Sequence, residues 1–289
     1  TPPLIFERGV LYIELLHKNF ITFWDALVFL SSLPLAGASF NAMKYGAEQE
    51  KQLMTELWSI DIKDNPLNFV KFAFPWNQEN TPLEGFTGPR KWQEKILRDI
   101  GNHIQRNQSL DMPEMFRLAV ASGRGIGKSA LVSWLILWML TTRLGSTIIV
   151  TANTEQQLRS RTWAELGKWL TLSINSHWFH KTATSLKPEK WFEEALIRDL
   201  QIDTGYYYAQ AQLWSEENPD AFAGIHSTYG VCLIMDEASG IPAPIYSVSE
   251  GFFSEPTSDR YWFTFSNPRR NTGPFYDSFH SKRKYWHNA

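Results

Sequence analysis

Apolar runs alternate with amphipathic stretches along most of the second half of the chain. Nearly continuous apolar or aromatic residues predict strands at 116–122 (FRLAVAS), 146–152 (STIIVTA), 203–211 (DTGYYYAQA), 229–237 (YGVCLIMDE) and 260–268 (RYWFTFSNP). Helices are expected over 128–143 and over roughly 154–172. Buried strands that alternate with helices indicate an α/β protein with a mainly parallel central sheet flanked by helices. Ligands of such sheets bind beyond the carboxyl ends of the strands.

The N-terminal part of the chain has a different pattern. From Asn19 to Phe40 the only charged residue is Asp25, and Pro34 interrupts the apolar run. A membrane span needs ~20 apolar residues, and a secretory signal needs a basic start and a cleavage site. We expect instead a helix that packs on the body of the protein, with no membrane association. Because residues 41–65 are polar and helix-prone, we predict a helical extension over 1–65 and one main domain over 66–289.

Composition narrows the class of protein only a little. With 289 residues, 43% of them hydrophobic, the chain can bury a large core. Its single cysteine, Cys232, excludes an internal disulfide and fits a reducing cytosol. The net charge of −2 gives no general affinity for nucleic acid, so any contact with DNA requires a local basic surface.

The segment ASGRGIGKSA (121–130) resembles a phosphate-binding loop, or Walker A motif, placed between a buried strand and a helix. A glycine-rich turn in this position points backbone N–H groups and a helix N-terminus at an anion. Lys128 is expected to reach the outer phosphates of a nucleotide, and the Ser129 hydroxyl to bind Mg²⁺. Serine replaces the usual first glycine, but it is small enough for most turn conformations. The predicted nucleotide-binding residues of the loop are Ser122, Gly123, Gly125, Ile126, Gly127, Lys128, Ser129 and Ala130.

Arg124 stands in the middle of this loop. Its guanidinium group could cover the outer phosphate and stabilise the charge that develops during transfer, as an arginine finger does. The alternative is an arginine that faces solvent or pairs with a neighbouring carboxylate. We predict the catalytic role for Arg124, together with Lys128.

Two carboxylates, Asp236 and Glu237, follow the apolar run VCLIM and form a candidate Walker B motif. An aspartate at the end of such a strand can hold Mg²⁺, and an adjacent glutamate can orient and deprotonate the attacking water. We therefore assign Asp236 to the metal and Glu237 to catalysis. The second carboxylate favours hydrolysis over phosphoryl transfer to a small molecule.

Two further segments carry weaker signals. In TFSNP (264–268), Ser266 and Asn267 can hydrogen-bond a phosphate or the attacking water, although Asn-Pro is also typical of an ordinary turn. In GPRKWQEKIL, Gln93 lies at the start of a predicted helix, where its amide could pair with an adenine edge. A surface glutamine is the alternative. Both Asn267 and Gln93 are candidate nucleotide-binding residues.

Taken together and in this order, these motifs resemble the ATPase domain of the large terminase subunit of tailed bacteriophages, the motor that packages DNA into the capsid. RKWQ resembles its adenine motif, SGRGIGKS its phosphate loop with the arginine at Arg124, AFAGIHS (221–227) its glycine–histidine turn, and TFSNP its coupling motif. The resemblance covers roughly residues 66–281. It implies a P-loop NTPase of the additional-strand, RecA-like type, with ATP and Mg²⁺ as cofactors.

The resemblance also implies partners and a place of action. These are double-stranded DNA, a portal protein, a small terminase subunit and further copies of the chain in a ring, in the cytoplasm of the infected bacterium at the procapsid portal. Members of the family usually continue into a nuclease domain, and residues up to Ala289 contain no convincing second acidic cluster, so nuclease activity is not expected from this chain. In such a ring an arginine of a neighbouring subunit can also reach the ATP, and Arg159, Arg161, Arg269 and Arg270 are unranked candidates.

Two other classes of protein remain open at this point. A helicase-like, DNA-dependent ATPase usually needs a second motor domain, for which the chain has no room. A nucleotide-binding assembly protein would use ATP to set its oligomeric state with little turnover. The complete set of Lys128, Ser129, Asp236 and Glu237 favours hydrolysis over this alternative.

Overall fold

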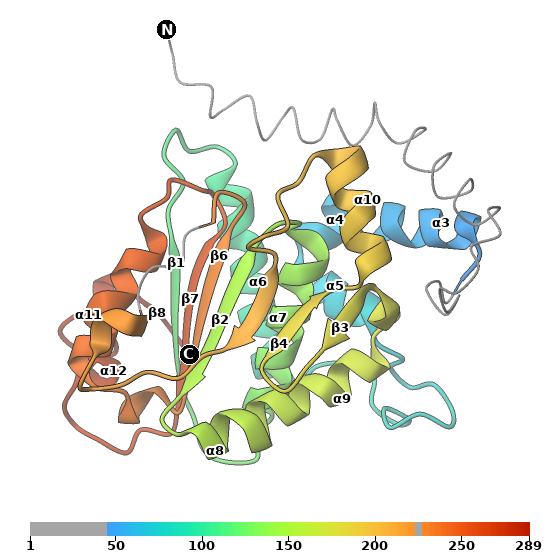
Figure 1. Cartoon of the computed structure of the whole chain (residues 1–289). Helices are drawn as coiled ribbons and strands as arrows, with labels where there is room; N and C mark the ends of the chain where they lie inside the picture. The colour runs from blue at the N-terminus through green and yellow to red at the C-terminus, as the bar shows by residue number, and fades with distance from the viewer. Residues whose placement is uncertain (1–44, 223–226) are drawn as a thin grey trace, which may run out of the picture.

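The computed structural model of the chain describes residues 45–222 and 227–289 (Figure 1). The helix predicted within 19–40 lies outside these residues, as does most of the glycine–histidine turn of AFAGIHS. Where the chain is described, no helix is both long and apolar enough to cross a lipid bilayer.

An eight-stranded sheet forms the centre of the molecule, with strand order β3-β4-β5-β2-β6-β7-β1-β8. Its strands are β1 (Phe116–Ala121), β2 (Thr147–Ala152), β3 (Phe179–Lys181), β4 (Ser185–Pro188), β5 (Tyr208–Ala211), β6 (Val231–Asp236), β7 (Arg260–Ser266) and β8 (His287–Asn288). All neighbours pair in parallel except β3 with β4 and β4 with β5. The predicted α/β fold with a mainly parallel sheet is therefore confirmed.

Helices cover both faces of this sheet. They are α3 (Ala47–Leu57), α4 (Ile60–Lys63), α5 (Pro66–Ala73), α6 (Lys91–Asn107), α7 (Lys128–Thr142), α8 (Glu155–Gln157), α9 (Ala164–Leu172), α10 (Lys190–Leu200), α11 (Ala243–Ser249) and α12 (Pro274–Asp277). Alternate residues of a strand point to opposite faces. Leu118 and Val120 of β1 accordingly join the core that contains α6, α7 and α9, whereas Ala119 joins a second core that contains α11 and Phe275 of α12.

Helix α7 is buried on every side. Its residues from Leu131 to Thr142 are all buried, because the helix lies against the sheet on one side and under α5, α6 and α9 on the other. A helix that is apolar all round is typical of the inside of a large core. The predicted helix 128–143 is thus confirmed, and its first residue directly follows the glycine-rich loop.

The helix predicted over 154–172 is continuous but not uniform. It begins as α8, passes through a π-helical section, η1 (Leu158–Trp163), and continues as α9. A π-helical section widens the turn by one residue and is frequent at functional sites. The predicted strand 203–211 is shorter in the structure, because only Tyr208–Ala211 pairs with β2 and β4.

The described part of the N-terminal extension packs on the main core. Leu53, Met54 and Leu57 of α3 are buried in the same cluster as α7, and Trp58 Nε1 donates to Thr141 O at 2.9 Å. Residues 45–65 therefore belong to the same packed body as the sheet. The division of the chain at residue 65 stays a prediction.

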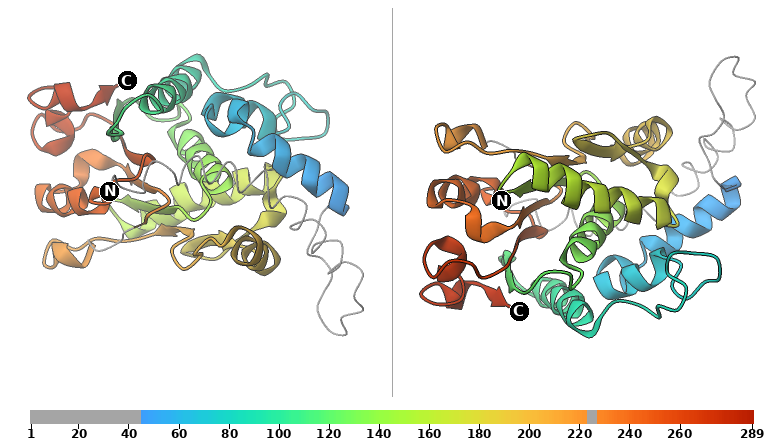
Figure 2. Two further views of the ribbon diagram at one scale, coloured as in Figure 1. Left: turned by 90° about the horizontal axis from the view of Figure 1, so that it is seen from above. Right: turned by 90° about the horizontal axis from the view of Figure 1, so that it is seen from below.

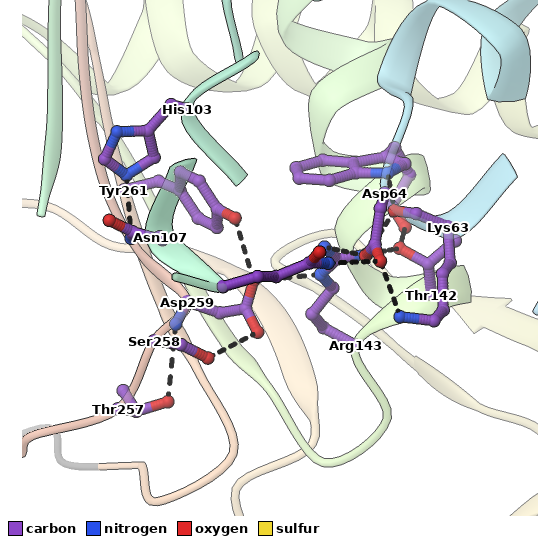
Figure 3. Close-up of polar contacts among 12 residues, drawn as sticks. Lys63, Asp64, His103, Asn107, Thr142, Arg143, Thr257, Ser258, Asp259 and Tyr261 are labelled. Carbon is purple, nitrogen blue, oxygen red and sulfur yellow. Dashed lines mark hydrogen bonds and ion pairs between the residues drawn. The ribbon is translucent and has the colours of Figure 1, made fainter. Parts of the chain in front are cut away.

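Figure 3 shows a polar network around Arg143. This residue follows the last residue of α7, at the opposite end of the helix from the glycine-rich loop. Arg143 Nη2 lies 2.9 Å from Asp64 Oδ1, and its Nε lies 3.0 Å from Asp259 Oδ1. Tyr261 donates to the same Asp259 oxygen at 2.8 Å. Burial lowers the pKa of Arg143, but Asp259, Tyr261 and Asp64 outweigh it and raise the pKa above the usual arginine range. The network joins α4, α7 and β7 in one ionic cluster.

Candidate functional site

A cavity of about 490 Å³ lies at the N-terminus of α7 and the carboxyl end of β6. The glycine-rich loop forms one wall, and α8, η1 and α9 form another. The lining residues are Arg124, Gly125, Ile126, Gly127, Lys128, Ser129, Ala130, Gln157, Arg161, Glu165, Asp236 and Glu237. The sequence motifs 124–130 and 236–237 therefore meet in one place, beyond the ends of the parallel strands as predicted.

The loop shows why serine is accepted at its first position. Gly125 and Gly127 have φ values of +71° and +94°, in the left-handed region that favours glycine. Ser122 is not among the residues with positive φ, so a Cβ atom there causes no strain. A Cβ atom on Gly127 would lie 2.9 Å from Gln93 Nε2. Glycine is thus required at Gly127 for two reasons and is not required at Ser122.

Lys128 is held toward the end of β7. Its Nζ atom donates to Gly123 O at 2.7 Å and to Asn267 Oδ1 at 2.9 Å, with a longer bond of 3.3 Å to Ser122 O. Partial burial lowers the pKa of Lys128, and Arg124 and Arg269 act in the same direction, while Asp236 and Glu237 oppose them. The Lys128 ammonium group is therefore influenced by two cations, Arg124 and Arg269, and by two carboxylates, Asp236 and Glu237.

Asp236 is fixed by two hydrogen bonds at the end of β6. Oδ2 accepts from Thr162 Oγ1 at 2.6 Å, and Oδ1 accepts from the backbone N–H of Glu237 at 3.0 Å. Asp236 is 8% exposed and Thr162 is 1% exposed. Burial raises the pKa of Asp236, and these two hydrogen bonds only partly offset that effect. One carboxylate is thereby held in a single orientation beside the loop.

Glu237 has an unusual backbone conformation, with φ 52° and ψ 38°. A non-glycine residue in this left-handed region stores strain of about 1–3 kcal/mol and occurs preferentially at functional sites. The turn brings Glu237 to the wall between the main cavity and a smaller one of about 90 Å³. The smaller cavity is also lined by Arg269 and Arg270, which follow the TFSNP segment. Both carboxylates therefore face the cleft, as predicted.

The donor set fits a magnesium ion held together with a nucleotide. The Ser129 hydroxyl and the Asp236 carboxylate are hard oxygen ligands, and both residues line the main cavity. Gln157 Oε1, which belongs to another wall of this cavity, is shielded from solvent and has no hydrogen-bond partner among the described residues. Within 45–222 and 227–289, no cluster of three or more histidine, cysteine or acidic residues could form a metal site by itself. Mg²⁺ is usually held by one or two carboxylates plus substrate phosphates, and Asp236 and Ser129 beside the phosphate loop could supply such ligands.

Gln93 lies under the loop. Its Oε1 atom accepts from Arg90 N at 2.8 Å, and its Nε2 atom donates to Gly127 O at 2.8 Å. The side chain is buried, and Gln93 is not among the residues that line the cavity. Trp92 Nε1 donates to Ile126 O in the same way, at 3.3 Å. The start of α6 therefore supports the phosphate loop, whereas adenine recognition by Gln93 stays a prediction.

Of the remaining predicted polar residues, Arg124, Ser122 and Asn267, only Arg124 lines the cavity. Arg124 is exposed on the cavity wall, and none of the ion pairs described for 45–222 and 227–289 includes it. Asn267 and Ser122 do not line the cavity, but each contacts Lys128. Ser266 Oγ donates to Ser239 Oγ at 2.8 Å and thereby ties the end of β7 to the turn after Glu237.

Among helix residues 155–165, the sequence pointed only to Arg159 and Arg161, as candidates to act on a neighbouring subunit, and not to Gln157, Thr162 or Glu165. Gln157, Arg161 and Glu165 recur at a spacing of four, which is the only signal that places them on one helix face. Thr162 gives no signal, because its contact with Asp236 depends on the π-helical section and on a separation of 74 residues. The cavity wall formed by α8, η1 and α9 is thus visible only in the structure.

The fold and the loop together are those of a P-loop NTPase of the additional-strand, RecA-like type. Strand β1 carries the phosphate loop, β6 carries the acidic pair, and β7 lies between them. That interposed strand defines the additional-strand arrangement and confirms the predicted fold class.

Comparisons with known proteins support the resemblance found in the motifs. A curated protein, "Probable terminase, large subunit" of Enterobacteria phage P7, is 28% identical to the chain over 170 residues. The match covers 56% of this chain and 31% of the phage protein. The chain thus matches about a third of the length of this relative. No family model matches the chain.

Solved structures of large terminases are also similar to the chain. A mutant of the large terminase ATPase domain of Thermus phage P74-26 gives a TM-score of 0.43 at 21% identity, over 68% of this chain and 70% of that one. The large terminase of a thermophilic bacteriophage in complex with ADP gives a TM-score of 0.44 at 17% identity, over 69% of this chain and 44% of that one. The predicted resemblance to phage large terminase subunits is confirmed by the match to the phage P7 protein.

Proposed function

We propose that the chain hydrolyses ATP to ADP and phosphate, and that 66–289 form its ATPase domain. One observation carries this proposal: Glu237 lines the same cavity as Lys128 and Ser129 of the phosphate loop. A carboxylate beside the phosphates can accept a proton from water as the water attacks the outer phosphorus atom. A site for nucleotide binding alone would not need this second carboxylate.

The residues have separate tasks in this reaction. Backbone N–H groups of Gly125 to Ser129 cradle the phosphates, and the ammonium group of Lys128 contacts the outer ones. Arg124 stabilises the charge that develops on the transferred group. Asp236 and Ser129 would hold Mg²⁺, which neutralises phosphate charge when it is bound. Glu237 holds the attacking water and takes its proton.

We further propose that hydrolysis drives double-stranded DNA into a viral procapsid. The support is the similarity to a phage large terminase subunit and the set of motifs in the order of that family. The role implies a ring of copies of this chain, a portal protein and a small terminase subunit as partners, at the portal in the infected cell. In such a cycle Asn267 would respond to the phosphates through its hydrogen bond with Lys128.

Steady-state ATP hydrolysis tests the proposal, measured with and without double-stranded DNA for the unmodified chain and for Glu237→Gln. The variant should bind nucleotide as tightly as the unmodified chain and lose turnover, because an amide cannot accept the proton. DNA should stimulate turnover of the unmodified chain. Equal turnover of both proteins would contradict the role of Glu237, and nucleotide binding without turnover in the unmodified chain would favour an assembly protein.

A further inference from the structure

The charge of the chain is unevenly distributed. Residues 267–289 contain Arg269, Arg270, Lys282, Arg283 and Lys284 but only one acidic residue, Asp277, which gives a net charge of 5 − 1 = +4. The whole chain has a net charge of −2, so the remaining residues sum to −6. The C-terminal segment is therefore a local basic region on an acidic protein.

Three of these cations form what we call the basic strip: Lys282, Arg283 and Lys284. All three are exposed, and none of the ion pairs described within 45–222 and 227–289 includes them. They lie on and beside a single turn of 3₁₀ helix, η6 (Arg283–Tyr285). Tyr285 is 57% exposed next to them, and Lys284 Nζ lies 4.7 Å from the centre of its ring. Because no acidic side chain pairs with these three cations in the described residues, they are available to bind an external anion.

The basic strip stands on a rigid base. Trp286 packs edge-on against Trp262 of β7 at 5.4 Å between ring centres, His287 Nε2 lies 2.9 Å from Asp99 Oδ2, and Asn288 donates to Ser278 O at 3.0 Å. Figure 2 shows this C-terminal segment, in dark red, at the edge of the molecule away from α3. A fixed backbone under long basic side chains is suited to repeated contacts with a regular array of charges.

The base is also connected to the nucleotide site. Strand β8 begins at His287, shortly after the basic strip, and pairs with β1, which ends at Ala121, next to the phosphate loop. The backbone N–H of Ala121 donates to Ala289 O at 3.0 Å, and that of Ser122 donates to Ser266 O at 3.0 Å. A force applied to the basic strip would therefore be transmitted through β8 to β1, the strand that precedes the phosphate loop.

We propose that Lys282, Arg283 and Lys284 contact the phosphates of double-stranded DNA. This inference rests on the proposed function, because it identifies the surface through which the motor holds its DNA. A basic strip of lysine and arginine on an acidic protein matches a dense line of phosphates without reading base sequence. The contact is electrostatic, so each phosphate neutralised releases about 0.9 counterion from B-form DNA.

The test is the salt dependence of binding to a short DNA duplex of mixed sequence, measured by fluorescence anisotropy. The variant is the triple substitution Lys282→Ala, Arg283→Ala and Lys284→Ala. The slope of log K against log salt should become shallower by about 2 to 3, because up to three phosphate contacts are lost. ATP turnover without DNA should stay unchanged, and stimulation by DNA should fall. A charge-conserving variant, Lys282→Arg with Lys284→Arg, should keep the slope of the unmodified chain.

A matched control removes three positive charges elsewhere, with Lys168, Lys187 and Lys190 changed to alanine on α9, β4 and α10. This control should leave the slope unchanged. An unchanged slope in the basic-strip variant, or an equal loss in the control, would overturn the proposal while the motor function stands. If the unmodified chain binds no duplex DNA but hydrolyses ATP, the DNA part of the proposed function fails together with the basic strip.

Discussion

Lys128 Nζ donates a hydrogen bond of 2.9 Å to Asn267 Oδ1, which joins the first residue of α7 to the residue that follows β7. The same two elements are joined near their opposite ends, where Arg143 Nε lies 3.0 Å from Asp259 Oδ1. The helix that follows the phosphate loop and the strand that ends in the TFSNP segment are therefore joined by polar contacts near both of their ends. Only the connection at Lys128 lies beside the nucleotide cavity.

Substitutions of Asn267 should separate geometry from charge. Asn267→Asp keeps an oxygen on Lys128 but adds a negative charge close to the phosphates, so we expect the Kd for ATP to rise by on the order of tenfold or more. Asn267→Ala removes the acceptor without adding charge and should change ATP affinity less. Nucleotide titration of both variants checks this. An aspartate variant that binds ATP as tightly as the alanine variant would refute the position of Asn267 beside the phosphates.

Arg124→Ala should lower turnover with little effect on ATP affinity. The side chain is exposed at the cavity wall, and an arginine that acts on the transition state contributes ~10³-fold or more to the rate. Single-turnover hydrolysis and equilibrium nucleotide binding measure the two quantities separately. Arg124→Lys is the matched control, because it keeps the charge but loses the planar fork. Equal losses in binding and turnover would make Arg124 a ground-state phosphate contact.

Thr162→Val should weaken Mg²⁺ at the site without changing the shape of the side chain. The Thr162 hydroxyl donates to Asp236 Oδ2 at 2.6 Å. Loss of a hydrogen bond that orients a metal ligand typically lowers metal affinity by about 10–100-fold. The readout is the Mg²⁺ concentration that half-saturates nucleotide binding, which requires no hydrolysis. Thr162→Ser keeps the donor and should behave like the unmodified chain. Identical Mg²⁺ dependence in the valine and serine variants would exclude a positioning role.

Asp236→Asn should stabilise the folded chain and abolish turnover. Burial raises the pKa of Asp236, so between its ordinary pKa and the raised folded value the native state binds more protons than the unfolded state. Stability therefore falls as pH rises through this window, and the carboxylate costs stability above it. Urea unfolding at about pH 7 should show a higher midpoint for the asparagine variant, and the difference should shrink toward about pH 4. A lower midpoint at neutral pH would contradict the desolvation argument.

Loss of Arg143 should be strongly destabilising. Arg143→Leu removes the buried cation that Asp64 and Asp259 share, at a cost of about 3–5 kcal/mol in the free energy of unfolding, although Asp64 keeps its ion pair with Lys63. Burial alone would raise the pKa of Asp259, but Arg143 outweighs it and lowers the pKa. The stability from this carboxylate is therefore present at neutral pH and is lost as pH falls below about 4. Adding Asp64→Asn and Asp259→Asn to Arg143→Leu should recover part of the loss, as chemical denaturation can measure.

The strands and the loop were predictable because their signals are local. Continuous apolar runs identified β1, β2, β6 and β7, and the spacing of glycines and lysine identified the phosphate loop within a few consecutive residues. The acidic pair follows from its position at the end of an apolar run. These features depend on neighbours in the chain, and such patterns can be read without the fold.

Other features depend on contacts between distant residues. The short strands β3, β4 and β8 have too few residues for a periodic signal. The bond from Thr162 to Asp236 and the cluster around Arg143 each join segments 74 or more residues apart. Gln93 was expected to face a nucleotide, and its structural contact with Gly127 spans 34 residues. Only the folded chain brings these pairs together.

The burial of α7 from Leu131 to Thr142 has a mechanical consequence. The helix is 15 residues long, which corresponds to about 22 Å, and close packing along Leu131 to Thr142 leaves it no free face along which to slide or bend. A displacement of its first turn is therefore expected to move the whole helix. Binding or release of phosphate at Lys128 would then also shift Arg143 and, through the ion pair with Asp64, the helices that precede the sheet.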